Sequence, residues 1–184
     1  KEKIMRLAPA VGIGLAFVLL ASVFAFAAQP DPAAQAAYDR RDYKTSVQIL
    51  EEQVKKNPND ADAMVLLGSA YRQLGDLAKS ENVLKKAVGL KGKEPQALLE
   101  YGQTLLALKK FKEAVSDFDK AISLKNDFEK AYYNRGAAKI ELKEFQSAIG
   151  DFDKSLSMGQ NPDSYFSRGQ AKYALNDRDG AMSD

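Results

Sequence analysis

Residues 61–90 alternate between apolar and polar positions at the spacing of a helix. Leu67 and Tyr71 are four residues apart, and Leu84 and Ala87 are three apart, so each pair falls on one helical face. The dipeptide at residues 75–76, Gly-Asp, lies between the pairs and is typical of a turn. The pattern therefore predicts two amphipathic helices joined by a short turn. No stretch of the chain shows the period-two alternation of a strand, and we expect an all-α fold.

The predicted helix pair recurs along the chain with a fixed period. Gly68, Gly102 and Gly136 follow one another at intervals of 34 residues. Gly169 comes after only 33, and we expect the missing residue in the connection at residues 158–162, where a loop can absorb a deletion. Three further positions keep the step of 34, namely Ser80, Ala114 and Ala148; Leu84, Phe118 and Phe152; and Ala87, Ala121 and Ser155.

A 34-residue helix–turn–helix unit with small residues at fixed positions resembles the tetratricopeptide repeat (TPR). The resemblance implies two antiparallel helices per unit, with small residues such as Gly68 and Ser80 allowing close approach of the backbones. Large residues such as Leu84 and Phe118 would then fill the space between units. Because one unit cannot bury its apolar face alone, we expect the copies to stack into a TPR helix–turn–helix solenoid with a concave and a convex side.

The period divides the chain into segments. We expect complete TPR units at residues 61–94, 95–128 and 129–161, and a truncated unit at residues 162–184 that continues beyond the last residue. An irregular segment precedes them. Residues 35–60 carry one clear amphipathic helix and one Ala-rich helix without the glycine, which is typical of a degenerate unit or an N-terminal cap. Residues 29–34, QPDPAA, are expected to form a short linker.

An apolar segment lies at the start of the chain. Residues 7–28 carry no charge, and as a helix they would span roughly 33 Å, about the thickness of the hydrocarbon core of a bilayer. We interpret residues 1–28 as a single transmembrane helix that anchors the chain and contacts membrane lipid through residues 7–28. The alternative is a secretory signal segment, because residues 25–27, AFA, match the A-x-A cleavage pattern.

The charges that flank this segment predict its orientation. Lys1, Lys3 and Arg6 precede it, so the positive-inside rule places the N-terminus in the cytoplasm. The repeats would then lie in a periplasm, in a lumen or outside the cell. A cleaved signal segment would export the repeats as well. We therefore expect a single-pass membrane protein whose repeats are on the exported side.

The amino-acid composition excludes several kinds of chemical site. The chain has neither Cys nor His, which removes thiol chemistry, disulfides and histidine-based acid–base or metal sites. The net charge of +2 arises within the first six residues, and the remainder carries 24 basic and 24 acidic residues. A balanced charge argues against a nucleic-acid partner. No phosphate-binding glycine loop is present. We expect a non-enzymatic protein with no cofactor, no metal and no catalytic residues.

The resemblance to TPR proteins implies that the first helix of each unit lines a concave groove for a protein partner. Six positions of each unit, the second, fifth, sixth, ninth, twelfth and thirteenth, would face it. Their apolar side chains would supply contact area, and their amides would bond the backbone of a peptide or a docked helix. The alternative is that the apolar members only pack between units. The candidate groove residues are Val65, Leu66, Ser69, Gln73, Leu99, Gln103, Leu106, Ala107, Tyr133, Asn134, Ala137, Ile140, Phe166, Ser167, Gln170 and Tyr173.

One TPR subclass clamps the C-terminal carboxylate of chaperones with Lys, Asn and Arg side chains from three successive units. Asn134 stands at the matching position of the second unit. The preceding unit has Leu99 and Gln103 in place of Lys and Asn, and the following unit has Asp163 and Ser167 in place of Lys and Arg. Because a carboxylate needs charge-assisted donors, we do not expect this clamp here.

Two recurring charged motifs have a structural interpretation. The sequence Asp-Phe-Asp occurs at residues 117–119 and 151–153, but residues i and i+2 of a helix point about 200° apart and do not easily share a metal ion. We interpret these aspartates as solvated charges beside a core Phe. Arg135 and Arg168 also recur, and we favour exposed basic edges or salt bridges between units over a binding strip for anionic headgroups.

These observations favour one function and leave alternatives open. The first hypothesis is a membrane-anchored TPR scaffold on the exported side of a membrane, acting as an accessory subunit or assembly factor of a membrane protein complex. The second is a self-assembling structural subunit whose open ends stack head to tail. A further alternative is a secreted periplasmic TPR binding protein after signal cleavage. A hydrolase would need two convergent acids, and the sequence shows no such pair.

Overall fold

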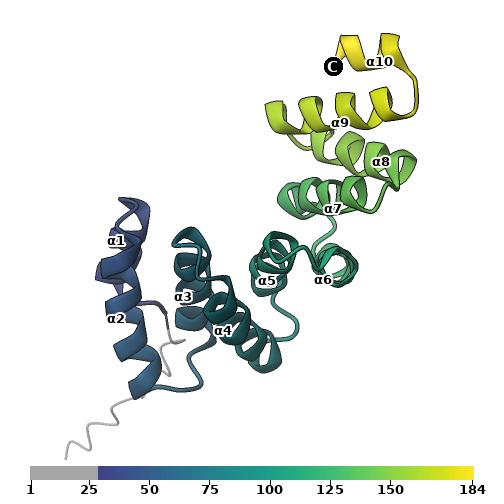
Figure 1. Cartoon of the computed structure of the whole chain (residues 1–184). Helices are drawn as coiled ribbons and strands as arrows, with labels where there is room; N and C mark the ends of the chain where they lie inside the picture. The colour runs from purple at the N-terminus through teal and green to yellow at the C-terminus, as the bar shows by residue number, and fades with distance from the viewer. Residues whose placement is uncertain (1–28) are drawn as a thin grey trace, which may run out of the picture.

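The computed structural model describes residues 29–184 of the chain, and this part is helical throughout (Figure 1). The predicted anchor at residues 7–28 lies outside it. Within residues 29–184, no helix combines the length and the hydropathy needed to cross a bilayer. The helices are α1 (Pro32–Asp39), α2 (Tyr43–Lys56), α3 (Ala61–Gln73), α4 (Leu77–Leu90), α5 (Pro95–Ala107), α6 (Phe111–Leu124), α7 (Glu129–Glu141), α8 (Phe145–Leu156), α9 (Pro162–Ala174) and α10 (Arg178–Ser183).

The helices stack in chain order into a solenoid, from α1 at one end to α10 at the other (Figure 1). Each helix packs on the next, and the odd-numbered helices α3, α5, α7 and α9 also contact one another across successive pairs. The even-numbered helices of the described part form no comparable contacts with one another. The stack therefore has an inner layer of odd-numbered helices and an outer layer of even-numbered ones. The predicted all-α solenoid of helix–turn–helix units is confirmed.

The turn inside each helix pair has one repeated backbone feature. Arg41, Gly75, Lys109, Lys143 and Asn176 all have φ between 60° and 80°. They succeed one another at intervals of 34, 34, 34 and 33 residues, each just after an odd-numbered helix. A left-handed residue at this point ends the helix and turns the chain back. The same short turn therefore generates every pair, although only one of the five positions is glycine.

The repeated glycines make room for a side chain of the partner helix. A Cβ atom on Gly102 would lie 2.5 Å from Cε1 of Phe118, and one on Gly136 would lie 2.8 Å from the same atom of Phe152. Gly68 faces Leu84 in the same way. The expectation that large residues such as Leu84 and Phe118 fill the space between units is thus incomplete, because Leu84, Phe118 and Phe152 also fill the glycine notch of their own unit.

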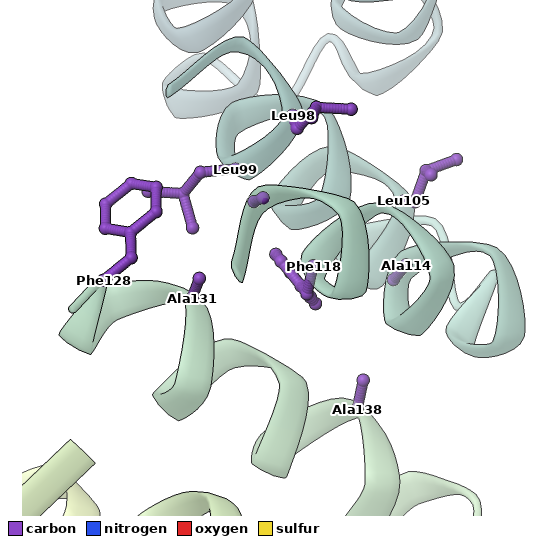
Figure 2. Packing of buried hydrophobic residues seen from close by; sticks show 9 residues of the cluster. Leu98, Leu99, Leu105, Ala114, Phe118, Phe128, Ala131 and Ala138 are labelled. Carbon is purple, nitrogen blue, oxygen red and sulfur yellow. The ribbon is translucent and has the colours of Figure 1, made fainter. Parts of the chain in front are cut away.

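The largest buried cluster of the described chain extends across units. It joins residues of α5, α6 and α7, and Phe118 is fully buried at its centre (Figure 2). Phe118 thereby packs within its unit and against the next one. Continuous burial of this kind is what makes a solenoid one cooperative core. The other members are Leu98, Leu99, Leu105, Ala114, Ala121, Phe128, Ala131 and Ala138.

The first helix pair starts earlier than the sequence suggested. Residues 32–34 were expected to be linker, but they form the first turn of α1. Pro32 stands at the start of the helix, where its missing N–H costs nothing, and Asp31 caps it by accepting from the Ala33 N–H at 2.7 Å. The side chain of Gln53 then holds the preceding backbone, accepting from Asp31 N–H and donating to the Gln29 carbonyl.

The one-residue deletion shortens a helix and not the connection that follows it. Helix α8 has 12 residues where α6 has 14, and five residues join α8 to α9 where four join α6 to α7. The deletion was expected in residues 158–162 alone. In the structure α8 ends early instead, at Leu156, and the connection is one residue longer than its counterpart.

Candidate partner-binding face

The odd-numbered helices form one surface with two hollows, which we call the odd-helix face. The N-terminal hollow, about 720 Å³, lies between α1, α3 and α5. The C-terminal hollow, about 900 Å³, lies between α7, α9 and α10. Because odd-numbered helices contact one another and even-numbered ones do not, the stack curves toward this face. A concave surface with hollows of this size is where a solenoid offers the most contact area to a partner.

The N-terminal hollow has an apolar floor and an acidic rim. Val65 and Leu66 on α3 are part-buried in it, beside Tyr38 of α1. Burial, together with the nearby Glu100 carboxylate, raises the pKa of the Tyr38 phenol above its ordinary value. The charged residues that line this hollow are Asp62, Glu94 and Glu100.

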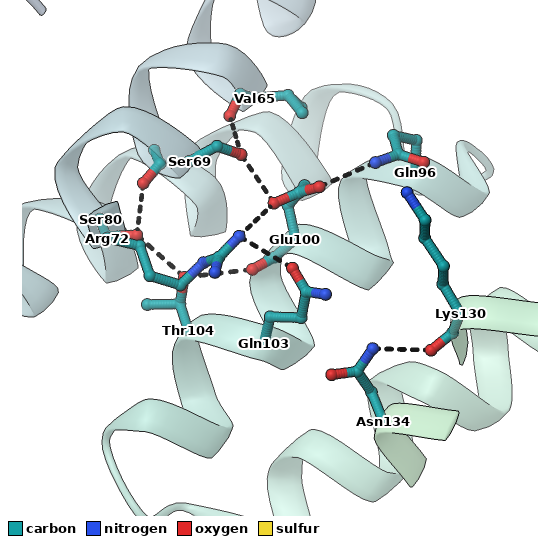
Figure 3. A network of polar contacts seen from close by, with 11 residues as sticks. Val65, Ser69, Arg72, Ser80, Gln96, Glu100, Gln103, Thr104, Lys130 and Asn134 are labelled. Atoms are coloured by element: carbon teal, nitrogen blue, oxygen red, sulfur yellow. Dashed lines mark hydrogen bonds and ion pairs between the residues drawn. The ribbon is translucent and has the colours of Figure 1, made fainter. Parts of the chain in front are cut away.

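A polar network crosses the odd-helix face between α3 and α5 (Figure 3). Arg72 Nη2 lies 2.7 Å from Glu100 Oε2 and 2.8 Å from Gln103 Oε1. Glu100 also accepts from the Ser69 hydroxyl at 2.7 Å and from the Gln96 amide at 2.8 Å. Both charged side chains are largely buried, with exposed fractions of 20% for Arg72 and 14% for Glu100. Geometry of this kind fixes the spacing of α3 and α5.

Sequence reasoning missed Arg72 and Glu100. Both stand at positions that the repeat directs toward the groove, the twelfth of one unit and the sixth of the next. Opposite charges at groove-facing positions of adjacent units could have indicated that the two side chains pair. Their pairing spans 28 residues and depends on how the units stack, so the list of apolar and amide candidates did not contain them.

The C-terminal hollow is aromatic. Phe166 and Tyr173 lie seven residues apart on α9, and their exposed fractions are 67% and 65%. Ile140 of α7 and Gln170 of α9 line the hollow with them. Large aromatic side chains this exposed on one helical face are typical of an interaction surface.

The candidate groove residues do not all reach the surface. Val65, Leu66 and Ser69 line the N-terminal hollow, and the C-terminal hollow contains Ile140, Phe166, Gln170 and Tyr173. Gln73 is exposed on α3, while seven others are part-buried or exposed between the hollows or beside them: Gln103, Leu106, Ala107, Tyr133, Asn134, Ala137 and Ser167.

The prediction that Leu99 lines the groove is wrong. Its exposed fraction is 1%, and its side chain lies beside the Phe128 ring in the core (Figure 2). The position rule directs it to the groove, but the connection between α6 and α7 places Phe128 over it. Ser69 is also nearly buried, and its hydroxyl is already bonded to the Val65 carbonyl and to Glu100. Leu99 therefore belongs to the core and Ser69 to the polar network.

Arginine–aspartate ladders link the C-terminal units. Arg135 on α7 bonds Asp151 on α8 through Nε at 2.9 Å and through Nη2 at 2.5 Å, and its Nη1 bonds Asp119 on α6 at 2.6 Å. Lys139 Nζ lies 2.8 Å from Asp151. One unit later, Arg168 makes the equivalent contacts with Asp184 and Asp153, joined by Lys172. The interpretation as salt bridges between units is confirmed.

The ladders also explain the Asp-Phe-Asp motifs. In residues 151–153 the first Asp bonds the Arg of its own unit and the second bonds the Arg of the next unit. Asp151 is 4% exposed, so the description of these aspartates as solvated charges is wrong for the first Asp of the motif. Asp117 is buried too, and it pairs with Lys120. Over residues 29–184, no cluster of three acidic side chains could hold a metal ion.

Stacked helix pairs, a repeated turn and a concave face of odd-numbered helices define a helical-repeat scaffold. Two family models match parts of the chain. A model described as "Anaphase-promoting complex, cyclosome, subunit 3" matches residues 39–121, and a model described as "TPR repeat" matches residues 102–143. A comparison with curated proteins gave no match. Each model covers less than half of the chain, and the TPR repeat model shows that the helix pairs it matches are similar to tetratricopeptide repeats.

The fold is similar to that of several solved structures. MamA from Desulfovibrio magneticus RS-1 aligns at a TM-score of 0.74 with 20% identity, covering 82% of this chain and 86% of that one. A thermophilic TPR protein of Thermus thermophilus aligns at 0.72 with 17% identity, covering 84% and 85%. The first TPR of Spaghetti, solved with the HSP90 peptide SRMEEVD, aligns at 0.62 with 25% identity, covering 63% and 93%.

The donors of a carboxylate clamp are not assembled on the odd-helix face. Asn134, the one residue that matches the clamp pattern, donates its amide to the Lys130 carbonyl of its own helix at 2.7 Å (Figure 3). Arg72 is engaged by Glu100 and Gln103. An acidic tail approaching this face would meet the carboxylates of the N-terminal hollow.

Proposed function

We propose that the chain is a binding scaffold that captures a protein partner on its odd-helix face. The observation that carries the proposal is the pair of open hollows on that face, which hold exposed Phe166 and Tyr173 at one end and Val65 and Leu66 at the other. TPR proteins are generally non-catalytic scaffolds that bind protein partners, and the solved Spaghetti domain holds a peptide.

The finer proposal concerns where the scaffold acts. The uncharged run at residues 7–28 and the basic residues before it support a tether with the repeats on the exported side. The side chain of Gln53 holds the backbone of residues 29–31 against α2. A tether leaving from there would keep the repeats close to the membrane surface. An accessory subunit or assembly factor of a membrane protein complex is the function that fits both features.

A substitution pair tests the binding face. The full chain is purified from its native membranes with a C-terminal tag, and the proteins that co-purify are quantified. Phe166→Asp with Gln170→Asp should remove a stoichiometric partner, because both side chains are exposed on α9. Lys86→Glu with Lys154→Glu, on exposed positions of the even-numbered helices, should leave the partner in place. Equal loss in both variants would overturn the proposal.

Self-assembly is the second candidate, favoured by the exposed apolar side chains near α10. Met182 is 86% exposed and Leu175 is 43% exposed. Sedimentation of the full chain at several concentrations distinguishes the two functions. A mass that grows with concentration and falls on Met182→Asp would favour stacking of copies, whereas a constant monomer mass favours a scaffold for another protein.

A further inference from the structure

We infer that the N-terminal hollow binds a short segment of the partner protein in which a Lys or Arg side chain stands beside an apolar residue. The inference rests on the proposed function and names the chemistry of the partner. It depends on two observations, namely an apolar floor between three helices and a lining whose charged side chains are all carboxylates.

The hollow is enclosed by parts of the chain that the structure describes. Its lining comes from α1, α3 and α5, which belong to three successive helix pairs, and from the backbone at residues 29–30 that precedes α1. The side chain of Gln53 bonds this backbone and fixes it in place. Val65 and Leu66 supply apolar surface inside. A volume of about 720 Å³ is that of a small-ligand site, so a few residues of a partner would fill it.

The three carboxylates differ in what already pairs with them. Asp62 lies 2.7 Å from Lys91 Nζ, and Glu100 lies 2.7 Å from Arg72 Nη2. Glu94 is exposed, and within residues 29–184 no cation forms an ion pair with it. Glu94 is therefore the carboxylate that is open to an incoming Lys or Arg. An acidic segment would be repelled at the same place.

The amide groups of the hollow favour a donor as well. Gln35 Nε2 donates to Asp39 at 2.9 Å, and Gln96 Nε2 donates to Glu100 at 2.8 Å (Figure 3). Each amide is thus held by a carboxylate of its own helix, and its carbonyl oxygen is left as an acceptor. Because Lys and Arg carry donors and no acceptors, they match a lining of carbonyl and carboxylate oxygens.

The repeat does not require carboxylates at these positions. Thirty-four residues after the three acidic residues, the chain has an amide, an aromatic ring and a second amide, at Gln96, Phe128 and Asn134. A side chain that every unit needs for packing would recur with the period, as the glycines do. The acidic lining is therefore specific to this hollow.

Three labelled peptides that differ only in charge test the inference. Each has about eight residues, with a central pair of Leu flanked by two Lys, two Gln or two Glu. Binding to the full chain is measured by fluorescence anisotropy in a zwitterionic detergent, against the same peptide in detergent alone. We expect saturable binding of the Lys peptide, weaker binding of the Gln peptide by about threefold, and weaker binding of the Glu peptide by about tenfold.

Glu94→Gln is the decisive variant, and Glu144→Gln is its matched control. Both residues are exposed and stand at the N-cap of a helix without a capping bond from the side chain, Glu94 at α5 and Glu144 at α8. Both variants remove one negative charge, and the chain should fold in each. Glu94→Gln should weaken the Lys peptide by about threefold and leave the Gln peptide unchanged. Glu144→Gln should change neither.

A variant of the floor tests the apolar part of the site. Val65→Ala removes apolar surface from the hollow without changing its charge. All three peptides share the Leu pair, so Val65→Ala should weaken each of them by a similar factor of about threefold. A loss confined to the Lys peptide would contradict the assignment of the Leu pair to this floor.

Three results would overturn the inference. The first is no binding of the Lys peptide, or equal affinity for the Lys and Glu peptides. The second is equal weakening of the Lys peptide in Glu94→Gln and Glu144→Gln. The third is an internal crosslink from a photo-reactive residue at position 66 to residues 1–28, which would make the chain's own segment the occupant. These results would leave the proposed function to its own test, the loss of the co-purifying partner on Phe166→Asp with Gln170→Asp.

Discussion

At the residue scale, the fold depends on notches that fit one side chain each. Gly102 has room for the Phe118 ring because it has no Cβ, and the Phe118 side chain is fully buried there. The period of 34 identified the glycines, but it did not show what each one accommodates. That depends on the crossing of two helices, which spacing along one sequence does not describe.

Gly102→Ala should destabilise the chain by about 1–3 kcal/mol, because the added methyl group would overlap Phe118 at 2.5 Å in a packed core. Gly89→Ala is the matched control. It lies inside α4 with no atom within 4 Å of the new Cβ, so it should stabilise by up to about 1 kcal/mol through helix propensity. Urea unfolding followed by circular dichroism measures both. An unchanged free energy of unfolding for Gly102→Ala would show that Phe118 does not need the space beside Gly102.

Tyr71 should make stability sensitive to alkaline pH. Burial, the hydrogen bond to Glu51 and the charge of Glu51 raise the pKa of its phenol well above the ordinary value near 10. Its contribution is complete below about pH 10 and is lost as the pH rises further, since the unfolded chain then releases the proton first. Tyr71→Phe should therefore flatten the fall in unfolding free energy between about pH 9 and 11. An unchanged slope would rule out this role.

At the element scale, the odd-numbered helices carry both the stacking contacts and the candidate site. The pair Arg72 with Glu100 sets the spacing of α3 and α5, and the pair Arg135 with Asp119 joins α7 to α6. The sequence predicted helix pairs and their order. It did not predict that Leu99 lies in the core, because the residue that covers it, Phe128, comes from the connection after α6.

Arg135→Ala should cost about 2 kcal/mol of stability, because Asp151 is 6% exposed at its side chain and would keep only Lys139 as a partner. Lys79→Ala provides the control. Its pair with Asp76 is exposed, at 60% and 39%, and should be worth about 0.5 kcal/mol or less. Thermal unfolding at low and high salt separates them further, since salt should screen the exposed pair. Equal losses in the two variants would show that the ladder is only a surface feature.

At the scale of the whole molecule, we propose a chain with two functional parts, a membrane tether and a concave binding face. The repeat class and its stacking could be predicted, because a fixed period of small and large residues specifies them. The two hollows could not, since they arise where neighbouring units leave space: between α1, α3 and α5, and between α7, α9 and α10. The membrane tether at residues 7–28 stays a prediction.

Alkaline carbonate extraction tests the tether. A retained transmembrane helix should keep the full chain in the membrane pellet, because carbonate removes peripheral proteins and leaves spanning helices. Mass spectrometry of the extracted protein would then find residues 1–28 still attached. A soluble chain beginning near Gln29 would show instead that the segment is a cleaved signal, while the repeats would still be exported.

If one face of the solenoid binds the partner, a photo-crosslinking scan in intact membranes should locate the partner on that face. Probes are placed one at a time on the odd-helix face at Leu66, Gln170 and Tyr173, and on exposed positions of the even-numbered helices at Lys86, Lys120 and Gln146. We expect one dominant crosslinked protein from the first set and none from the second. Crosslinks of equal yield from both sets, or from the even-numbered helices alone, would contradict it.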